Sequence, residues 1–139
     1  MPDASNTDFS SLTALVVDDY DSMRSRLAAA LKALGVTVTE TVNGVEAMNA
    51  LKNSAFDLVI TDIVMPEMDG FELCEEVRKT PGLLDLPVIV TSTHCDTHYI
   101  VKALRLGADD YLPKPLDANL LKRVLARVMT PNPVEASHG

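Results

Sequence analysis

Three aspartates and one lysine have the side-chain types and positions that phosphate or metal chemistry requires. Asp18 and Asp19 follow the apolar run 15–17, Asp62 follows the apolar run 58–61, and Lys114 follows the short run 110–113. In an open parallel sheet, ligands bind at the carboxyl ends of the strands. If these runs are strands of such a sheet, the four side chains meet in one small pocket. Such a pocket is expected to bind a divalent cation and to handle a phosphoryl group.

The charges of these side chains favour a hard cation. Three carboxylates at one point repel one another, and Lys114 offsets one negative charge. Mg²⁺ takes one or two protein carboxylates and keeps several waters and substrate phosphate oxygens, so this set of residues fits it. Zn²⁺ prefers His and Cys ligands. His94, Cys95 and His98 form a separate cluster of such ligands, but structural zinc sites usually have four, so we do not favour metal binding there.

An acidic pair at the start of a helix has a simpler interpretation. Asp18 or Asp19 alone would more often cap the helix that follows. The position of Asp62 at the end of a central strand favours the pocket instead. By contrast, Asp57 and the pair 109–110 precede their strands, so we expect them at the opposite edge of the sheet as solubilising or turn residues.

Strand and helix patterns alternate five times along the chain. The expected strands cover 12–17, 36–42, 56–61, 86–91 and 110–112, and the expected helices cover 20–34, 43–52, 69–80, 96–106 and 117–129. This alternation predicts an α/β fold, a doubly wound parallel sheet with right-handed crossovers. The domain is expected to span 11–129, between a flexible segment 1–10 and a disordered segment 130–139.

Composition excludes several classes of protein. The 139 residues include 20 acidic and 12 basic ones, giving a net charge of −8, which argues against a nucleic-acid-binding surface. No apolar run approaches the roughly 20 residues that span a bilayer. Residues 1–11 contain no basic side chain, so they are not expected to be a signal peptide. Two cysteines without framework spacing favour a reducing compartment, and we expect a cytoplasmic protein.

Four segments together resemble the receiver domain of bacterial two-component response regulators. They are Val17–Asp19, the run DIVMPEMDG at 62–70, Ser92–Thr93, and the run GADDYLPKP at 107–115. Their spacings agree as well: 43 residues separate Asp19 from Asp62, 30 separate Asp62 from Ser92, and 22 separate Ser92 from Lys114. The resemblance covers about residues 11–129. It implies a flavodoxin-like (βα)5 fold with strand order 2-1-3-4-5, and it is strongest to the single-domain, CheY-like chemotaxis branch.

The resemblance also implies roles for the strand-end residues. Asp62 would accept a phosphoryl group from the phosphohistidine of a histidine kinase or phosphotransfer protein. Asp19, Asp62 and the backbone carbonyl of Val64 would ligate Mg²⁺, and Asp18 would act through a bound water. Lys114 would pair with a phosphoryl oxygen. Neutralising charge and positioning the groups in this way is what phosphoryl transfer needs from a protein.

Two further residues would form the switch of the family. The spacing selects Ser92 among three adjacent hydroxyls as the one that bonds the phosphate; Thr91 would point into the sheet, and Thr93 stands where the family usually has a small residue. Tyr111 resembles the switching aromatic, although a half-buried strand tyrosine with a wet hydroxyl is a common alternative. The peptide bond before Pro115 would be cis.

The implied function is a phosphorylation-gated switch that binds a downstream partner protein as a monomer or a phosphorylation-induced dimer. It would catalyse its own phosphorylation and dephosphorylation without being an enzyme acting on other substrates, and it would contact neither nucleic acid nor membrane directly. Val64 and His94 occupy positions that tune hydrolysis of the phosphoaspartate; the apolar Val64 predicts slow dephosphorylation. The candidate partner contacts, some of which could equally be a solvated helix face, are Tyr99, Ile100, Lys102, Arg105, Tyr111, Pro113, Lys122, Arg123 and Arg127.

Two alternatives keep part of this chemistry. A Mg²⁺-dependent phosphatase of the haloacid-dehalogenase type would need an acid two residues after its nucleophile, and Val64 stands there instead. A docking module that works without phosphorylation could keep the fold, but no residue favours it. A dinucleotide site is excluded because the chain has no Gly-x-Gly-x-x-Gly.

Overall fold

The computed structural model describes residues 9–65, 67–93 and 97–129, which form five strands and five helices in strict alternation. The strands are β1 (Thr13–Val17), β2 (Thr37–Thr41), β3 (Leu58–Asp62), β4 (Val88–Ser92) and β5 (Asp110–Pro113). The helices are α1 (Asp21–Ala33), α2 (Gly44–Asn53), α3 (Gly70–Lys79), α4 (Thr97–Arg105) and α5 (Ala118–Met129).

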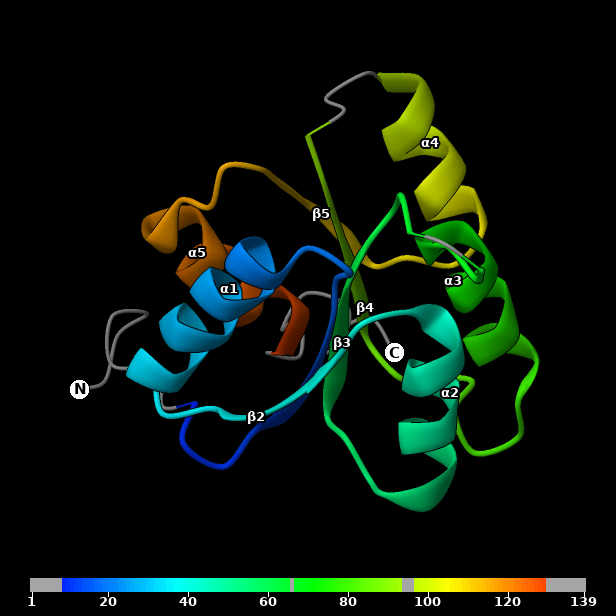
Figure 1. Ribbon diagram of the computed structural model, residues 1–139, viewed down its shortest axis with the longest axis horizontal. Helices are drawn as coiled ribbons and strands as arrows, with labels where there is room; N and C mark the ends of the chain where they lie inside the picture. Colours follow the sequence, from blue (N-terminus) through cyan, green and yellow to red (C-terminus); the bar gives the residue numbers. More distant parts are fainter. Residues whose placement is uncertain (1–8, 66, 94–96, 130–139) are drawn as a thin grey trace, which may run out of the picture.

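All strand pairs are parallel, and the sheet order is β2-β1-β3-β4-β5. Helices α1 and α5 cover one face, and α2, α3 and α4 cover the other (Figure 1). This is the flavodoxin-like (βα)5 arrangement with strand order 2-1-3-4-5, so the predicted fold class is confirmed. In this order the chain reverses direction across the sheet between β1 and β3, where such folds form their binding crevice.

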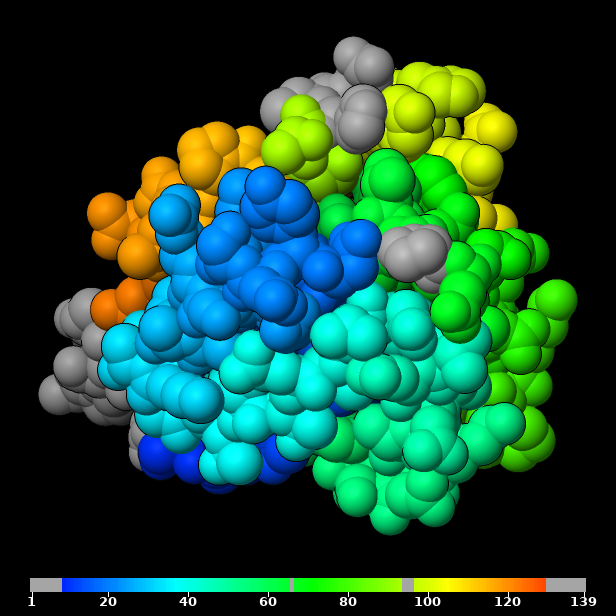
Figure 2. All heavy atoms as spheres, viewed as in Figure 1, coloured from blue at the N-terminus to red at the C-terminus, as the bar shows by residue number. Residues whose placement is uncertain are grey.

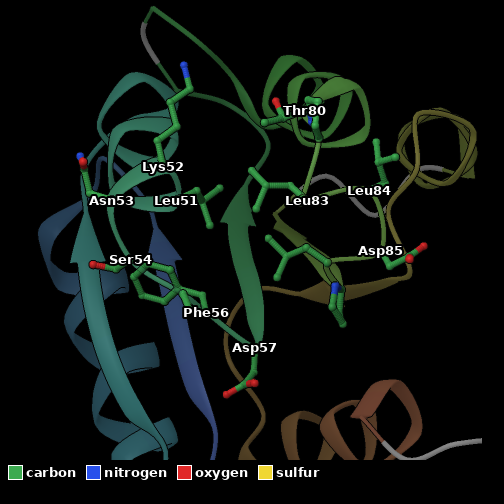
Figure 3. A pocket seen from close by; sticks show the side chains of 15 residues that line it. Leu51, Lys52, Asn53, Ser54, Phe56, Asp57, Thr80, Leu83, Leu84 and Asp85 are labelled. Carbon is green, nitrogen blue, oxygen red and sulfur yellow. The ribbon is translucent and has the colours of Figure 1, made fainter.

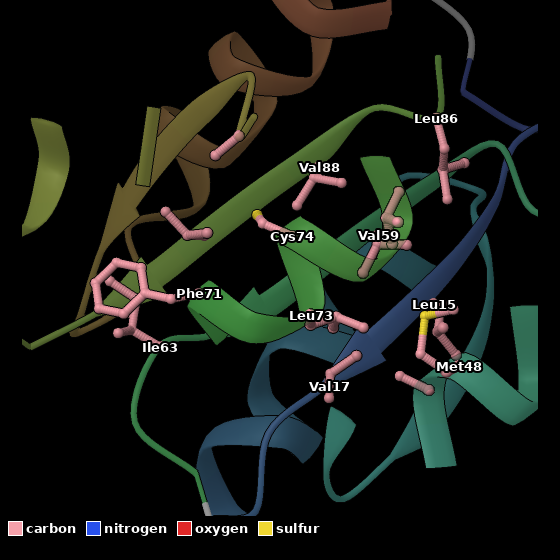
Figure 4. Close-up of a cluster of buried hydrophobic side chains, with 14 of the residues drawn as sticks. Leu15, Val17, Met48, Val59, Ile63, Phe71, Leu73, Cys74, Leu86 and Val88 are labelled. Carbon is pink, nitrogen blue, oxygen red and sulfur yellow. The ribbon is translucent and has the colours of Figure 1, made fainter. Parts of the chain in front are cut away.

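The strands are apolar because both faces of the sheet are covered. Leu15 and Val17 of β1 enter the cluster under α2 and α3 (Figure 4), whereas Val16, between them, packs under α1 and α5. This alternation, with every central residue buried, is expected for parallel strands covered on both faces. The edge strand β2 differs: Thr37, Thr39 and Glu40 are exposed.

Helix ends follow from local hydrogen bonding. The Asn43 side chain accepts from the amide of Glu46 at the start of α2. Asp69 and Glu72 form a reciprocal capping box at α3, and Asp117 accepts from two amides at the start of α5. Asn43, Asp69 and Asp117 are each the first residue of a helix range that the sequence predicts. None of the helices in the described ranges is long and apolar enough to span a membrane.

Phe9 lies before residue 11, where the sequence predicts that the domain begins. Phe9 is buried, 3% exposed, against the α1–α5 side of the sheet, so it belongs to the folded core. β3 and β4 begin two residues later than predicted and end one residue later, which places Asp62 and Ser92 within their strands. The remaining residues of the expected terminal segments, 1–8 and 130–139, lie outside the described residues.

Candidate functional site

The carboxylates of three aspartates gather at the carboxyl edge of the sheet. Asp18 directly follows β1, Asp19 comes next, and Asp62 ends β3. One carboxylate oxygen from each lies within 4.8 Å of the others. Asp18 and Asp62 are buried, while Asp19 is exposed. The sheet order explains the gathering, because β1 and β3 are adjacent parallel strands that end side by side.

The ammonium of Lys114 joins this cluster from the end of β5. Its Nζ lies 2.8 Å from Asp18 Oδ2 and 3.3 Å from Asp62 Oδ1. The Lys114 amide donates to the Ser92 carbonyl at 2.9 Å, which ties the end of β5 to the end of β4. The Lys114–Pro115 peptide bond is cis, as the resemblance implies. The three segments that supply these groups lie close together at one end of the molecule (Figure 2).

Burial and neighbouring charges shift the pKa of Asp62. Burial raises the pKa of Asp62 above its ordinary value, and the neighbouring carboxylate of Asp18 raises it further. The charge of Lys114 and the amide of Ile63, which donates to Asp62 Oδ1 at 2.9 Å, oppose the rise but do not cancel it. Additional positive charge near Asp62 would therefore favour the ionised carboxylate.

The segment after β3 is fixed by a close backbone contact. The Gly70 amide donates to the Ile63 carbonyl at 2.8 Å, and a Cβ on Gly70 would lie 2.3 Å from the backbone oxygen of Asp62. Only glycine permits this approach without moving the backbone that carries Asp62. Val64 lies in the same loop and is 56% exposed.

The three adjacent hydroxyl residues of β4 differ in environment. Thr91 is buried, and its Oγ1 donates to the Thr61 carbonyl at 3.5 Å, so its hydroxyl is bonded to the neighbouring strand β3. Ser92 is also buried at the end of the strand, whereas Thr93 is exposed. The hydroxyl of Tyr111 donates to the Ser92 carbonyl at 3.3 Å. Tyr111 and Ser92 therefore contact each other across the β4–β5 pair.

The donor set fits a hard divalent cation. Carboxylate oxygens are what Mg²⁺ and Ca²⁺ prefer, and the exposed Asp19 leaves the cluster open to water on one side. An ion held there would add positive charge beside Asp62 and would favour its ionised form. The softer cluster considered at 94–98 is not comparable, because residues 94–96 lie outside the described residues.

The acids at the opposite edge have structural partners, so they are more than solubilising residues. Asp57 accepts from the Thr13 amide at 2.8 Å. Asp109 accepts from the Val88 amide and pairs with Arg78, and Asp110 pairs with Arg127. Each of these carboxylates satisfies an amide or a guanidinium near the beginning of a strand.

An open groove also lies at that opposite edge. It has a volume of about 940 Å³ and is lined by the segments before β3 and β4, including Phe56, Leu83 and Asp85 (Figure 3). None of the three clustered aspartates lines this groove. Despite its volume, it is therefore not the candidate site for metal binding or phosphoryl transfer.

Arg78 was not singled out from the sequence. Its guanidinium donates to the carbonyls of Gly107 and Leu86 at 2.6 and 2.7 Å and pairs with Asp109 at 3.0 Å. In the sequence it is one of two basic residues in the last turn of a helix, which is an ordinary position for a cation. Only the folded topology brings it to β4 and β5.

The candidate partner-binding residues fall into groups. Tyr99 stacks on Phe71 with 6.1 Å between ring centroids, and Lys102 Nζ lies 4.4 Å from the Phe71 ring, so both are already engaged with α3. Arg127 is held by Asp110 at 2.6 Å. The others are half-buried or exposed: Ile100, Arg105, Tyr111, Pro113, Lys122 and Arg123.

Comparison with known proteins decides the family. Residues 14–126 match the response regulator receiver domain family. The chain belongs to this family. The receiver domain is 40% identical over 114 residues to response regulator MprA of a Mycobacterium species, covering 82% of this chain and 47% of that protein. It thus spans about half the length of this curated relative.

Solved structures agree with this assignment. Chemotaxis protein CheY4 of Vibrio cholerae superposes with a TM-score of 0.80 at 30% identity, covering 84% of this chain and 98% of the other. The receiver domain of the sensor histidine kinase PA1611 of Pseudomonas aeruginosa has a TM-score of 0.80 at 26% identity, over 86% and 98% of the two chains. That structure holds a magnesium ion in its active-site cleft. The receiver domain described here therefore belongs to two-component signalling.

Proposed function

We propose that this receiver domain is a phosphorylation-gated switch in which Asp62 is the phosphoacceptor. The observation that carries the proposal is the meeting of Asp62 with Lys114, at 3.3 Å, beside two further carboxylates at the carboxyl edge of the sheet. A phosphoryl group on Asp62 Oδ would lie between an ammonium and a cation site. Both would neutralise charge on the transferring oxygens.

The phosphoryl donor is a phosphohistidine on a histidine kinase or phosphotransfer protein. An oxygen of the ionised Asp62 attacks phosphorus, the P–N bond breaks, and the imidazole leaves with the electron pair of that bond. Lys114 holds a phosphoryl oxygen through its ammonium. Mg²⁺, held by Asp19, Asp62 and the carbonyl of Val64 with Asp18 acting through a water, would supply the additional positive charge.

Ser92 and Tyr111 form the switch in this proposal. The Ser92 hydroxyl would bond the phosphoryl group, which draws the end of β4 toward Asp62. Because the Tyr111 hydroxyl donates to the Ser92 carbonyl, a shift of Ser92 changes the partner of Tyr111. The contact supports a direct link between the phosphoryl site and β5.

The output is proposed to be a protein contact on the face formed by α4, β5 and α5. Ile100, Pro113 and Lys122 are half-buried there and Arg123 is exposed. Tyr99, Lys102 and Tyr111 would join them once the switch moves. The partner is a downstream protein, or a second phosphorylated copy. The net charge of −8 disfavours direct contact with nucleic acid and with anionic membranes.

Acetyl phosphate with Mg²⁺ tests the proposal, because it replaces the kinase. We expect an acid-stable, base-labile phosphoryl adduct on Asp62, absent from Asp62→Asn and absent when EDTA removes the metal. An adduct that persists in Asp62→Asn would place the acceptor elsewhere. Release of phosphate from many unrelated esters would instead indicate a phosphatase.

A further inference from the structure

Arg24 connects the acidic cluster to two other parts of the fold. It lies in α1, and its side chain is only 14% exposed. Nη1 donates to the backbone carbonyl of Asp18 at 2.9 Å, Nη2 to Asp21 Oδ1 at 2.7 Å, and Nε to Glu40 Oε1 at 3.2 Å. One guanidinium thus joins the turn after β1, the start of α1 and the edge strand β2.

The Asp18 carbonyl belongs to the peptide bond that links the two adjacent aspartates. A peptide unit is planar, so holding its oxygen fixes the plane from which Asp19 departs. The amide of Asp18 is also held, by the Thr41 carbonyl at 3.1 Å, and its carboxylate accepts from the Tyr20 amide at 2.9 Å. Asp19 itself is exposed, so the direction of its carboxylate depends on this backbone.

The charge of Arg24 is matched by its own neighbours. Asp21 and Glu40 both lie within ion-pair distance of the guanidinium. Their negative charges offset its positive charge, which weakens its electrostatic effect on the aspartate cluster. The direct contact with the cluster is a hydrogen bond to an uncharged carbonyl. This arrangement favours a geometric effect on the cluster over an electrostatic one.

We propose that Arg24 is a positioning residue for the Mg²⁺ site, acting through the Asp18 carbonyl to set the direction of Asp19. The inference rests on the proposed function, since it concerns the same metal site. Groups that orient metal ligands from behind typically change metal affinity by about 10- to 100-fold when they are removed.

Isothermal titration of the metal-free protein with MgCl₂ tests the inference without any phosphoryl donor. We expect Arg24→Gln to weaken Mg²⁺ binding by about 10-fold or more, the lower end of the effect of such residues. The matched control is Arg26→Gln, which removes the same charge from an exposed residue of the same helix close to Asp18 and Lys114. We expect it to leave the affinity within about twofold, as a screened surface charge should.

The outcomes separate the two claims. Absence of Mg²⁺ binding in the unchanged protein would overturn the proposed function. Binding that Arg24→Gln and Arg26→Gln weaken equally, or that neither weakens, would overturn only the role of Arg24.

Two milder variants cover the case in which Arg24→Gln does not fold. Arg24→Lys can keep one hydrogen bond to the Asp18 carbonyl, so we expect it to retain part of the affinity. Glu40→Gln keeps Arg24 but removes its ion pair with Glu40, so the guanidinium is held less firmly. We expect this variant to lose less than about tenfold in Mg²⁺ affinity. Unchanged affinity in Glu40→Gln together with full affinity in Arg24→Lys would contradict the inference.

Discussion

Lys114 Nζ lies nearer to Asp18 than to Asp62, at 2.8 Å against 3.3 Å. The ammonium therefore occupies the space beside both carboxylates that a bound cation would also approach. On the proposed function, Lys114 and Mg²⁺ would compete for the same negative charge before phosphorylation. After phosphorylation, the new phosphoryl oxygens would provide negative charge for both the Lys114 ammonium and Mg²⁺.

Replacing Lys114 should therefore separate metal binding from phosphorylation. We expect Lys114→Met to bind Mg²⁺ about tenfold more tightly, because a unit charge a few ångströms away no longer repels the ion. The same variant should accept phosphate from acetyl phosphate more slowly. Titration calorimetry and an adduct time course measure the two effects, with Lys52→Met at the opposite edge as the control. Weaker Mg²⁺ binding in Lys114→Met would contradict the competition.

The raised pKa of Asp62 predicts a pH dependence of stability. The folded protein holds the Asp62 proton to a higher pH than the unfolded chain, whose carboxyl titrates near 3.8. Between these two pKa values the folded state binds more protons, so this carboxyl lowers the free energy of unfolding as pH rises. Its stabilising contribution is complete below the unfolded pKa and is lost once the pH passes the folded pKa.

Urea unfolding in EDTA across this pH range checks the sign. The stability of Asp62→Asn relative to the unchanged protein should increase with pH through the window and then level off. A relative stability that falls with pH would mean that Lys114 overcomes the effect of burial.

The side chain of Val64 should control the lifetime of the phosphoaspartate. It is apolar and exposed, so it cannot orient a water for attack on phosphorus. We expect Val64→Asn to speed loss of phosphate by roughly tenfold, below the range of full general acid–base catalysis. Val45→Asn, at a similarly exposed valine of α2, is the control. Equal decay of the two variants would remove Val64 from the account.

Arg78 should matter for stability and not for chemistry. Its hydrogen bonds to two backbone carbonyls and its pair with Asp109 hold α3 to the starts of β4 and β5. We expect Arg78→Gln to lower the free energy of unfolding by about 2 kcal/mol, since two partly buried carbonyls lose their donor. Lys79→Gln, one residue later and exposed, should change it by less than about 0.5 kcal/mol. Mg²⁺ affinity should be the same in both; a loss confined to Arg78→Gln would contradict a purely structural role.

The fold could be predicted from the sequence because its pattern is consistent along the chain. Strand β3 is buried throughout and begins with the apolar run 58–60. The side chains of Asn43, Asp69 and Asp117, the first residues of three predicted helix ranges, cap the helices that follow them. In a parallel sheet the carboxyl ends of the strands lie at one edge. The meeting of Asp18, Asp62 and Lys114 could therefore be predicted from the sequence.

Other features depend on contacts that no local pattern reveals. Arg24 and Arg78 look like ordinary helix cations until the fold brings distant backbone carbonyls to them. Phe9 lies in a polar terminal segment, and a single aromatic residue among polar ones produces no hydrophobic periodicity that would indicate a strand or a helix. The burial of Asp62 behind Lys114, which raises its pKa, likewise depends on the packed side chains.

Beryllofluoride binding followed by two-dimensional amide NMR tests the central claim most directly, since this anion mimics a phosphoryl group on a carboxylate. With Mg²⁺ present, we expect shifts at Asp62, Ser92, Tyr111 and along α4 that are absent in Asp62→Asn and reversed by EDTA. An unchanged spectrum, or the same changes in Asp62→Asn, would contradict the claim that Asp62 is the acceptor that moves this switch.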